Sequence, residues 1–167
     1  MKDRKKELIE LMNLYGDYLK QTAFHVLHDV QLAEDMTQET FISFYQKKQF
    51  KGQSSPKTYL YSIMMNHIKM YLRKNRLDIV SEDVIYQSTE NLIFEDHTIN
   101  KMDMSYALNS LDYKYRETLI LFYYNDLSME EICDVLNCSL SSTKMRLKRG
   151  KEKLKVMIGG THEEDIN

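Results

Sequence analysis

Apolar side chains recur at helical spacing through the first half of the chain. In residues 1–28 they come three or four positions apart, and residues 29–48 repeat the pattern. This is the spacing of one buried face on an amphipathic helix. A third such stretch begins at Ser55-Pro56, with Ser as the N-cap and Pro at the first helical position, and runs to about Arg76. The first half is therefore predicted to form three amphipathic helices.

The pattern resumes near residue 101 and predicts helices over residues 101–111 and 112–124, then two shorter segments joined by a tight turn. Ser128 and Glu131 form an S-x-x-E capping box at the start of the first segment. Asn137 tolerates the left-handed conformation that the turn needs. The second helix, from about Ser141, has one narrow inward stripe: Thr143, Leu147, Gly150 and Leu154. Together these features predict a helix-turn-helix.

The second helix of this motif is strongly basic. Seven Lys and Arg residues lie between Lys144 and Lys155, against one acid. The side chains that point away from the inward stripe include Lys144, Met145, Lys148 and Arg149. Cations there can reach phosphates or the acceptor edge of guanine in a major groove. A lysine-rich helix can also be a solvated surface, but the cap, the turn and the stripe together favour DNA binding.

Charge changes sign along the first half. Asp35, Gln38 and Glu39 share an acidic, amide-bearing face, which is either solvated or a docking face for a basic partner. Residues 47–76 then contain eight Lys and Arg residues and no Asp or Glu. Four aromatic rings are interleaved with them: Phe50, Tyr59, Tyr61 and Tyr71. Cations beside rings suit single-stranded nucleic acid, although some of these rings are expected in the core.

Residues 79–100 are acidic and have no sustained period, which indicates an extended or partly ordered linker. The tail, residues 159–167, is also acidic and expected to be disordered. With only five Gly and one Pro in 167 residues, little material is left for β-turns. The expected fold is all-α, with two small helical domains over residues 1–78 and 101–158 joined by an acidic flexible linker.

Composition also limits the possible functions. A net charge of −2 argues against a protein that coats nucleic acid. Any basic surface must be confined to part of the chain and offset by acidic residues elsewhere. No signal peptide and no apolar run long enough to span a membrane are found, so a cytoplasmic protein is expected. No paired carboxylates, phosphate loop or nucleophile motif point to an enzyme, and no cofactor is expected.

The cysteine and histidine pairs do not form a convincing metal site. Cys133 and Cys138 flank the turn of the helix-turn-helix, and Cys133 is placed on the buried face. A disulfide is not expected in a reducing compartment, and two thiols without nearby histidines make a poor zinc site. His25 and His28 lack a third ligand, which favours a solvated or packing role.

Short motifs follow one another along the chain: residues 33–41 (AEDMTQETF), 50–52 (FKG), 59–63 (YLYSI), Asn66, 72–74 (LRK), 127–132 (LSMEEI) and 142–147 (STKMRL). In this order they resemble the motifs of bacterial RNA polymerase sigma factors of the extracytoplasmic-function group. The resemblance covers nearly the whole chain, and the pattern in the first unit is more specific than the helix-turn-helix.

The resemblance implies a protein without an active site that binds core RNA polymerase and directs it to promoters, here of a stress or envelope regulon. It assigns core docking to Asp35, Gln38 and Glu39. It assigns the melted minus-ten element to Lys51, Lys57, Tyr59, Asn66, Lys69 and Arg73. It assigns the duplex minus-thirty-five element to Ser142, Lys144, Met145, Arg146, Lys148 and Arg149. Residues 1–78 would then be sigma region 2 and residues 101–158 region 4.

The resemblance also implies an anti-sigma protein as a partner and a monomer when free. The main alternative is a stand-alone helix-turn-helix regulator, which would be a dimer that binds two half-sites. Two departures from the family pattern stand out. Met145 replaces a small polar residue, so promoter preference does not transfer, and Gly150 is expected to let the last turns of the basic helix fray.

Overall fold

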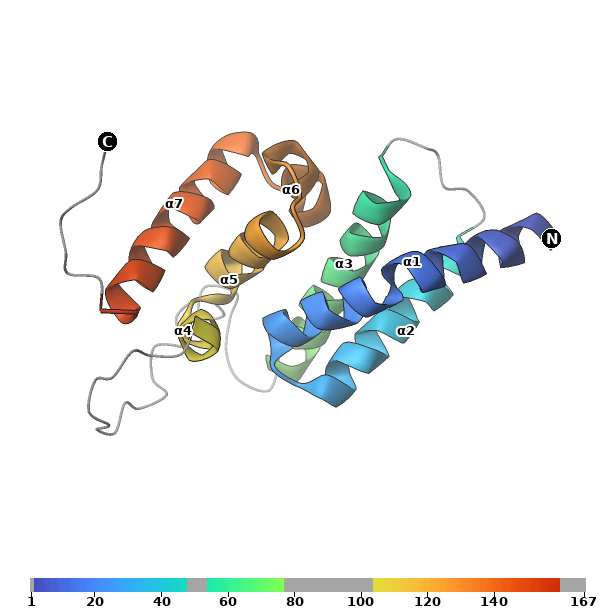
Figure 1. Ribbon diagram of the computed structural model, residues 1–167, viewed down its shortest axis with the longest axis horizontal. Coiled ribbons are helices and arrows are strands. Elements are labelled where there is room, and N and C mark those ends of the chain that lie inside the picture. Colours follow the sequence, from blue (N-terminus) through green and yellow to red (C-terminus); the bar gives the residue numbers. More distant parts are fainter. Residues whose placement is uncertain (1, 48–53, 77–103, 160–167) are drawn as a thin grey trace.

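The computed structural model describes residues 2–47, 54–76 and 104–159, and within these ranges every regular element is a helix (Figure 1). The all-α expectation is therefore confirmed. Several predicted features lie outside the described residues: Phe50, Lys51, the linker over residues 79–100 and the tail from residue 160. The elements are α1 (Lys2–Leu27), α2 (Val30–Gln46), α3 (Pro56–Arg76), α4 (Met104–Ser110), α5 (Tyr113–Leu119), the π-helix η1 (Ile120–Tyr124), α6 (Met129–Leu136) and α7 (Leu140–Met157).

Helices α1, α2 and α3 form the first unit, with α2 packed against both of the others. Capping fixes where two of them begin. The Asp29 carboxylate accepts a hydrogen bond from the backbone N–H of Leu32 at 2.8 Å. The Ser55 hydroxyl accepts one from the backbone N–H of Thr58 at 3.0 Å. These are the donors that a helix start leaves without an intrahelical partner, so the local sequence sets both boundaries.

The second unit contains the predicted helix-turn-helix, α6 and α7. Both hydrogen bonds of the capping box are present: the Ser128 hydroxyl accepts from the backbone N–H of Glu131, and the Glu131 carboxylate accepts from the backbone N–H of Ser128. Asn137 is left-handed at φ 51°. Helix α7 continues to Met157, so the expected fraying near Gly150 is absent. A Cβ at Gly150 would lie 3.1 Å from Leu119 Cδ1. Glycine therefore lets α7 approach α5 closely, and that packing stabilises the end of the helix.

The two units share one hydrophobic core. Buried residues of α1, α2 and α3 continue into a group from the second unit, which comprises Ile120, Leu121, Leu127, Ile132 and Val135. Helix α6 packs against α3 (Figure 1). The π-helix η1 packs against α1. The expectation of two helical units holds, but in this arrangement they are packed on each other rather than merely tethered by the linker.

Polar contacts reinforce this junction at Asn125, directly after η1. The Asn125 side-chain amide donates to the hydroxyls of Thr22 at 2.7 Å and Tyr61 at 2.8 Å, and all three residues are buried. The amine of Lys57 donates to the Asn125 backbone carbonyl at 2.9 Å. One residue thus ties η1 to both α1 and α3.

The π-helix was not expected, since the sequence predicts one continuous α-helix through Tyr124. In η1 the backbone N–H of Asn125 donates to the carbonyl of Ile120, five residues back, at 3.1 Å. A π turn holds more residues than an α turn, so it changes which side chains face the core. Here Tyr123 and Tyr124 are exposed while Asn125 is buried. The π turn thus accompanies the burial of Asn125 at the contact with the first unit.

Candidate nucleic-acid interface

The acidic face of α2 is solvent-exposed at all three positions singled out from the sequence. Asp35, Gln38 and Glu39 point outward, and only Asp35 has a local partner, the Gln31 amide at 3.3 Å. Glu34, which directly precedes Asp35, is instead paired with Lys20 of α1. The α2 helix therefore presents carboxylates and an amide that remain available for a partner.

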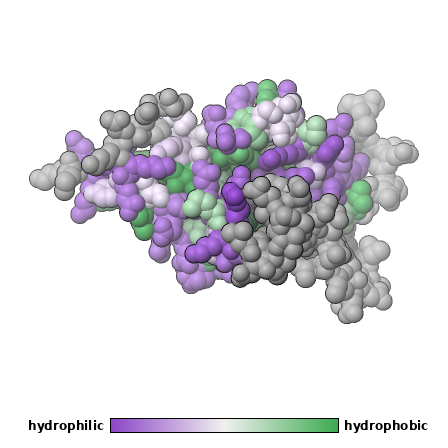
Figure 2. Space-filling model, turned by 180° about the vertical axis from the view of Figure 1, so that it is seen from behind, coloured by the Kyte–Doolittle hydropathy of each residue, from purple (hydrophilic) through white to green (hydrophobic). Residues whose placement is uncertain are grey.

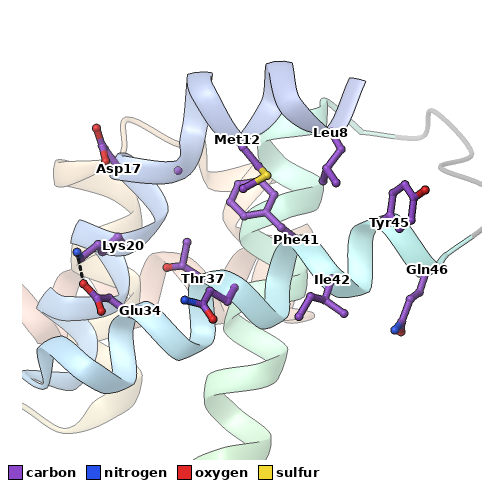
Figure 3. A pocket seen from close by; sticks show the side chains of 12 residues that line it. Leu8, Met12, Asp17, Lys20, Glu34, Thr37, Phe41, Ile42, Tyr45 and Gln46 are labelled. Carbon is purple, nitrogen blue, oxygen red and sulfur yellow. Dashed lines mark hydrogen bonds and ion pairs between the residues drawn. The ribbon is translucent and has the colours of Figure 1, made fainter. Parts of the chain in front are cut away.

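A groove of about 700 Å³ runs between α1 and α2 beside this face (Figure 3). The residues that line it include Met12, Gln38, Ile42 and Tyr45. The apolar pattern of residues 29–48 predicts Tyr45 on the buried side of α2, but 40% of this side chain is exposed. The expectation is wrong because the buried stripe, which includes Met36, Phe41 and Phe44, is narrower than the apolar pattern. Exposed apolar side chains next to carboxylates are typical of a protein-binding surface.

Helix α3 carries four of the candidate minus-ten residues on one side. At ~100° per residue, Tyr59, Asn66, Lys69 and Arg73 fall within one arc of the helix. Asn66, Lys69 and Arg73 are exposed, and Tyr59 is half-buried. Lys57 lies on the opposite side of α3 and contacts the second unit through Asn125. The structure thus brings four of these residues together and separates Lys57 from them.

The tyrosines on α3 differ in environment, which the sequence alone does not resolve. Tyr61 is only 1% exposed and belongs to the shared core, where burial raises the pKa of its hydroxyl. Tyr59 packs edge-on against Phe44, with ring centroids 6.0 Å apart. Tyr71 is 38% exposed. Tyr59 and Tyr71 thus keep some ring surface exposed, but at ~100° per residue Tyr71 lies on the opposite side of α3 from Lys69 and Arg73.

Helix α7 exposes the side chains expected to face DNA. Lys144, Met145, Lys148 and Arg149 are all exposed, while Thr143, Leu147 and Gly150 are buried against the rest of the unit. Ser142 is half-buried, and its backbone N–H donates to the hydroxyl of Ser139, the N-cap of α7. The inward stripe is confirmed.

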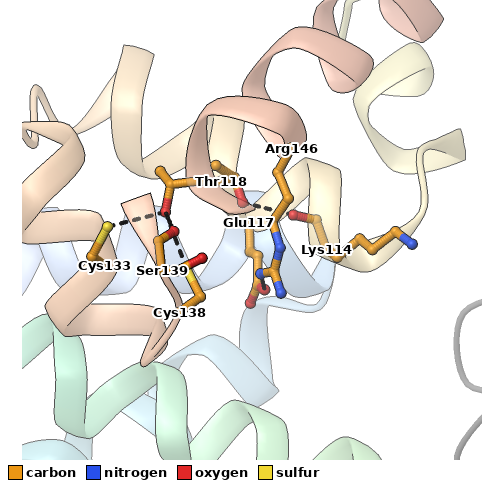
Figure 4. Close-up of polar contacts among 8 residues, drawn as sticks. Lys114, Glu117, Thr118, Cys133, Cys138, Ser139 and Arg146 are labelled. Carbon is orange, nitrogen blue, oxygen red and sulfur yellow. Dashed lines mark hydrogen bonds and ion pairs between the residues drawn. The ribbon is translucent and has the colours of Figure 1, made fainter. Parts of the chain in front are cut away.

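Arg146 differs from its neighbours because its guanidinium turns toward α5. It lies 3.3 Å from the Glu117 carboxylate beneath α7 (Figure 4). Glu117 is buried; its pKa is raised to about 7 by burial, with Arg146 opposing the shift. Sequence reasoning missed Glu117, whose only signal is an acid among apolar residues of the segment YRETLILF. Arg146 therefore fixes α7 on α5 instead of reaching outward.

The cysteine and histidine pairs are both at packing positions. Cys133 and Cys138 are free thiols and half-buried, so Cys133 is less enclosed than expected. The His25 ring packs edge-on against Tyr124 at 4.4 Å, and burial lowers the pKa of this imidazole. In the part of the chain that the structure describes, no three His, Cys, Asp or Glu residues are grouped as metal ligands. Over the same residues, no helix is long and apolar enough to cross a bilayer.

Comparison with known families identifies two matching regions, one in each helical unit. Residues 11–77 match the family described as Sigma-70 region 2, and residues 101–154 match Sigma-70, region 4. The ECF RNA polymerase sigma factor SigM of Bacillus subtilis (strain 168) is 27% identical over 159 residues, which cover 93% of this chain and 98% of SigM. SigW of the same strain is 28% identical over 164 residues, covering 89% of this chain and 87% of SigW.

Two solved structures share the fold. One is the sigma factor RpoE in complex with the anti-sigma factor NepR from Bartonella quintana, with a TM-score of 0.70 and 23% identity, covering 97% of this chain and 100% of that one. The other is CnrH in complex with the cytosolic domain of CnrY, with a TM-score of 0.68 and 18% identity, covering 95% of this chain and 91% of CnrH.

Proposed function

The chain belongs to the sigma-70 family, in its extracytoplasmic-function group, and we propose how its surfaces divide the task of promoter-specific initiation. As a sigma factor it is a partner of core RNA polymerase and promoter DNA and directs transcription initiation. It is not an enzyme, because a sigma factor has no catalytic step of its own. The proposal concerns which residues contact the polymerase and which contact DNA.

The α2 face with Asp35, Gln38 and Glu39, together with the adjoining α1–α2 groove, is proposed to dock on core polymerase. Carboxylates supply charge complementarity to a basic partner, and the apolar groove supplies area that becomes buried. The exposure of these three residues next to Met12 and Ile42 is the observation that carries this assignment.

Two other surfaces are proposed to read the promoter. The face of α3 with Tyr59, Asn66, Lys69 and Arg73 joins cations to aromatic surface, which suits the unpaired bases of a melted minus-ten element. The exposed face of α7 with Lys144, Met145, Lys148 and Arg149 suits the major groove of a duplex minus-thirty-five element. Ser142 lies at the N-terminal end of the same face, and Arg146 supports it from behind through Glu117.

In the packed arrangement of the two units, the Lys57 side chain is held at the contact between them. Its amine is bonded to Asn125, and the hydroxyl of Thr58 donates to the Glu131 carboxylate of α6 at 3.0 Å. We infer that α6 moves away from the N-terminal end of α3 before Lys57 contacts a promoter. Binding to core polymerase at the α2 face is the step proposed to favour the separated state.

We further propose that the free protein is a monomer, that it acts in the cytoplasm where polymerase and promoters meet, and that an anti-sigma protein holds it inactive. RpoE, which shares the fold, was solved in complex with the anti-sigma factor NepR, and CnrH was solved with the cytosolic domain of CnrY. The α1–α2 groove with its exposed apolar side chains is the surface such a partner would compete for.

The docking assignment is tested by charge reversal and a core-polymerase binding assay. Asp35→Lys with Glu39→Lys is expected to weaken binding by about tenfold or more, because like charges then face the basic partner. Glu10→Lys is the matched control, since Glu10 is an exposed acid on the side of α1 away from the groove. Equal binding by the double variant and the control would remove α2 from the interface.

A further inference from the structure

The two cysteines lie at the two ends of the turn between α6 and α7. Cys133 is in the last turn of α6, and Cys138 directly follows the left-handed Asn137. The backbone N–H of Cys138 donates to the carbonyl of Cys133 at 3.1 Å. This six-residue closure is the Schellman arrangement, in which the side chains at its two ends meet. The turn itself therefore brings the two thiols to one place.

Both sulfurs contact a single atom, the hydroxyl oxygen of Thr143 on α7. The distances are 3.3 Å from Cys133 Sγ and 3.1 Å from Cys138 Sγ (Figure 4). Thr143 is fully buried, and its hydroxyl lies 3.1 Å from the carbonyl of Ser139, to which it donates. A hydroxyl has one donor and two acceptor sites, so two S–H donors complete its hydrogen bonding. The reduced thiols thus belong to the contact between α6 and the first turn of α7.

Neither cysteine is fully buried, so a small oxidant has access to the pair. We propose that Cys133 and Cys138 form a reversible oxidation site that responds to peroxide. One thiol loses its proton to solvent, and the resulting thiolate attacks the peroxide and becomes a sulfenic acid; the released hydroxide, or alkoxide from an organic peroxide, takes up a proton. The second thiolate then attacks that sulfur, forms the disulfide and releases hydroxide. Two electrons pass to the peroxide, and a thiol reductant restores both cysteines.

The disulfide has no S–H to donate, so Thr143 loses both of its sulfur partners when it forms. The new bond also draws the end of α6 toward Cys138, next to Ser139, the N-cap of α7. Both changes act on the first turn of α7, directly before Lys144 and Met145. The oxidised protein therefore recognises the upstream promoter element less well. This last step rests on the proposed role of α7, whereas formation of the disulfide does not.

The experiment treats the full-length protein with hydrogen peroxide and measures two quantities. Intact mass and free-thiol counting report the disulfide, as loss of two hydrogens and of both thiols in a monomer, reversed by dithiothreitol. Run-off transcription with core polymerase reports function, on a promoter and on the same promoter with its upstream element scrambled. Upstream-dependent output is expected to fall by about fivefold or more on oxidation and to recover on reduction.

The variant Cys133→Ser with Cys138→Ser is the matched control, because serine keeps an O–H that can donate to Thr143. It is expected to transcribe like the reduced protein and to ignore peroxide. Failure of the wild-type protein to form the intramolecular disulfide would overturn the proposal, and so would a disulfide that leaves output unchanged. If the reduced protein transcribes both promoters equally, the role of α7 fails instead, and the mass measurement still decides whether the oxidation site exists.

Discussion

Glu117 places a carboxyl group beneath α7, where burial raises its pKa to about 7 even with Arg146 at 3.3 Å. An unfolded chain would titrate the same group near 4.5. Between those two values the folded protein binds more protons than the unfolded one, so this residue makes the folded state less stable as pH rises. The Arg146 contact reduces that penalty and at the same time fixes the orientation of α7.

Glu117→Gln should therefore change how stability depends on pH. The free energy of unfolding of the wild-type protein, measured relative to that of the variant, is expected to be about 2 kcal/mol larger at pH 5 than at pH 8, so the wild-type protein is relatively more stable at pH 5. Urea denaturation of both proteins at the two pH values measures this difference, and other titrating groups cancel between them. The same difference at pH 5 and pH 8 would show that Glu117 ionises as readily in the folded state as in the unfolded chain.

At the scale of the element, the exposed cations of α7 differ in their position along the helix. Lys148 and Arg149 are exposed near the middle of the helix, whereas Lys155 is exposed in its last turn. Recognition helices contact bases mainly through their N-terminal part. Position along the helix, rather than charge alone, should decide which of these residues matter to promoter choice.

Lys148→Ala and Arg149→Ala are each expected to cost about 1–3 kcal/mol in binding at the upstream element if the side chain contacts a base edge. A phosphate contact would instead weaken binding uniformly and lower the salt dependence. Lys155→Ala removes the same charge two turns further on and is the control. Competition binding by polymerase that carries each variant measures the effect. If all three behave alike, α7 contributes only diffuse charge.

The sequence predicts elements better than it predicts contacts between them. The capping box at Ser128, the left-handed Asn137 and the inward stripe of α7 are local or periodic signals, and all three are confirmed. The buried Glu117, the π turn of η1 and the placement of Tyr61 in the core depend on residues far away in the chain. Helix propensity alone predicts fraying at Gly150, whereas in the structure this glycine allows close packing against Leu119.

At the scale of the whole molecule, the junction at Asn125 decides whether the two promoter surfaces can act together. Its amide bridges Thr22 and Tyr61 in a buried position, and Lys57 closes the same site from α3. No sequence motif marks Asn125, because its importance comes from partners more than sixty residues away. Separation of the units breaks these hydrogen bonds and exposes the shared apolar core.

Asn125→Ala should favour the separated state. It leaves two buried hydroxyls without their donor, at a cost of roughly 2 kcal/mol to the packed arrangement. The radius of gyration from small-angle X-ray scattering is expected to rise in the variant and not in Asn13→Ala, which removes an exposed amide on α1. An unchanged radius in a folded Asn125→Ala protein would show that the apolar contacts alone hold the units together.

The central claim is that this chain directs core polymerase to promoters through two separate DNA-reading surfaces. Run-off transcription from a pool of genomic fragments, with purified core polymerase and with or without the protein, tests it most directly. The expected result is a set of discrete new transcripts whose start sites share two spaced upstream elements. Absence of such transcripts, together with tight sequence-specific binding by the protein alone, would contradict the claim and favour a stand-alone helix-turn-helix regulator.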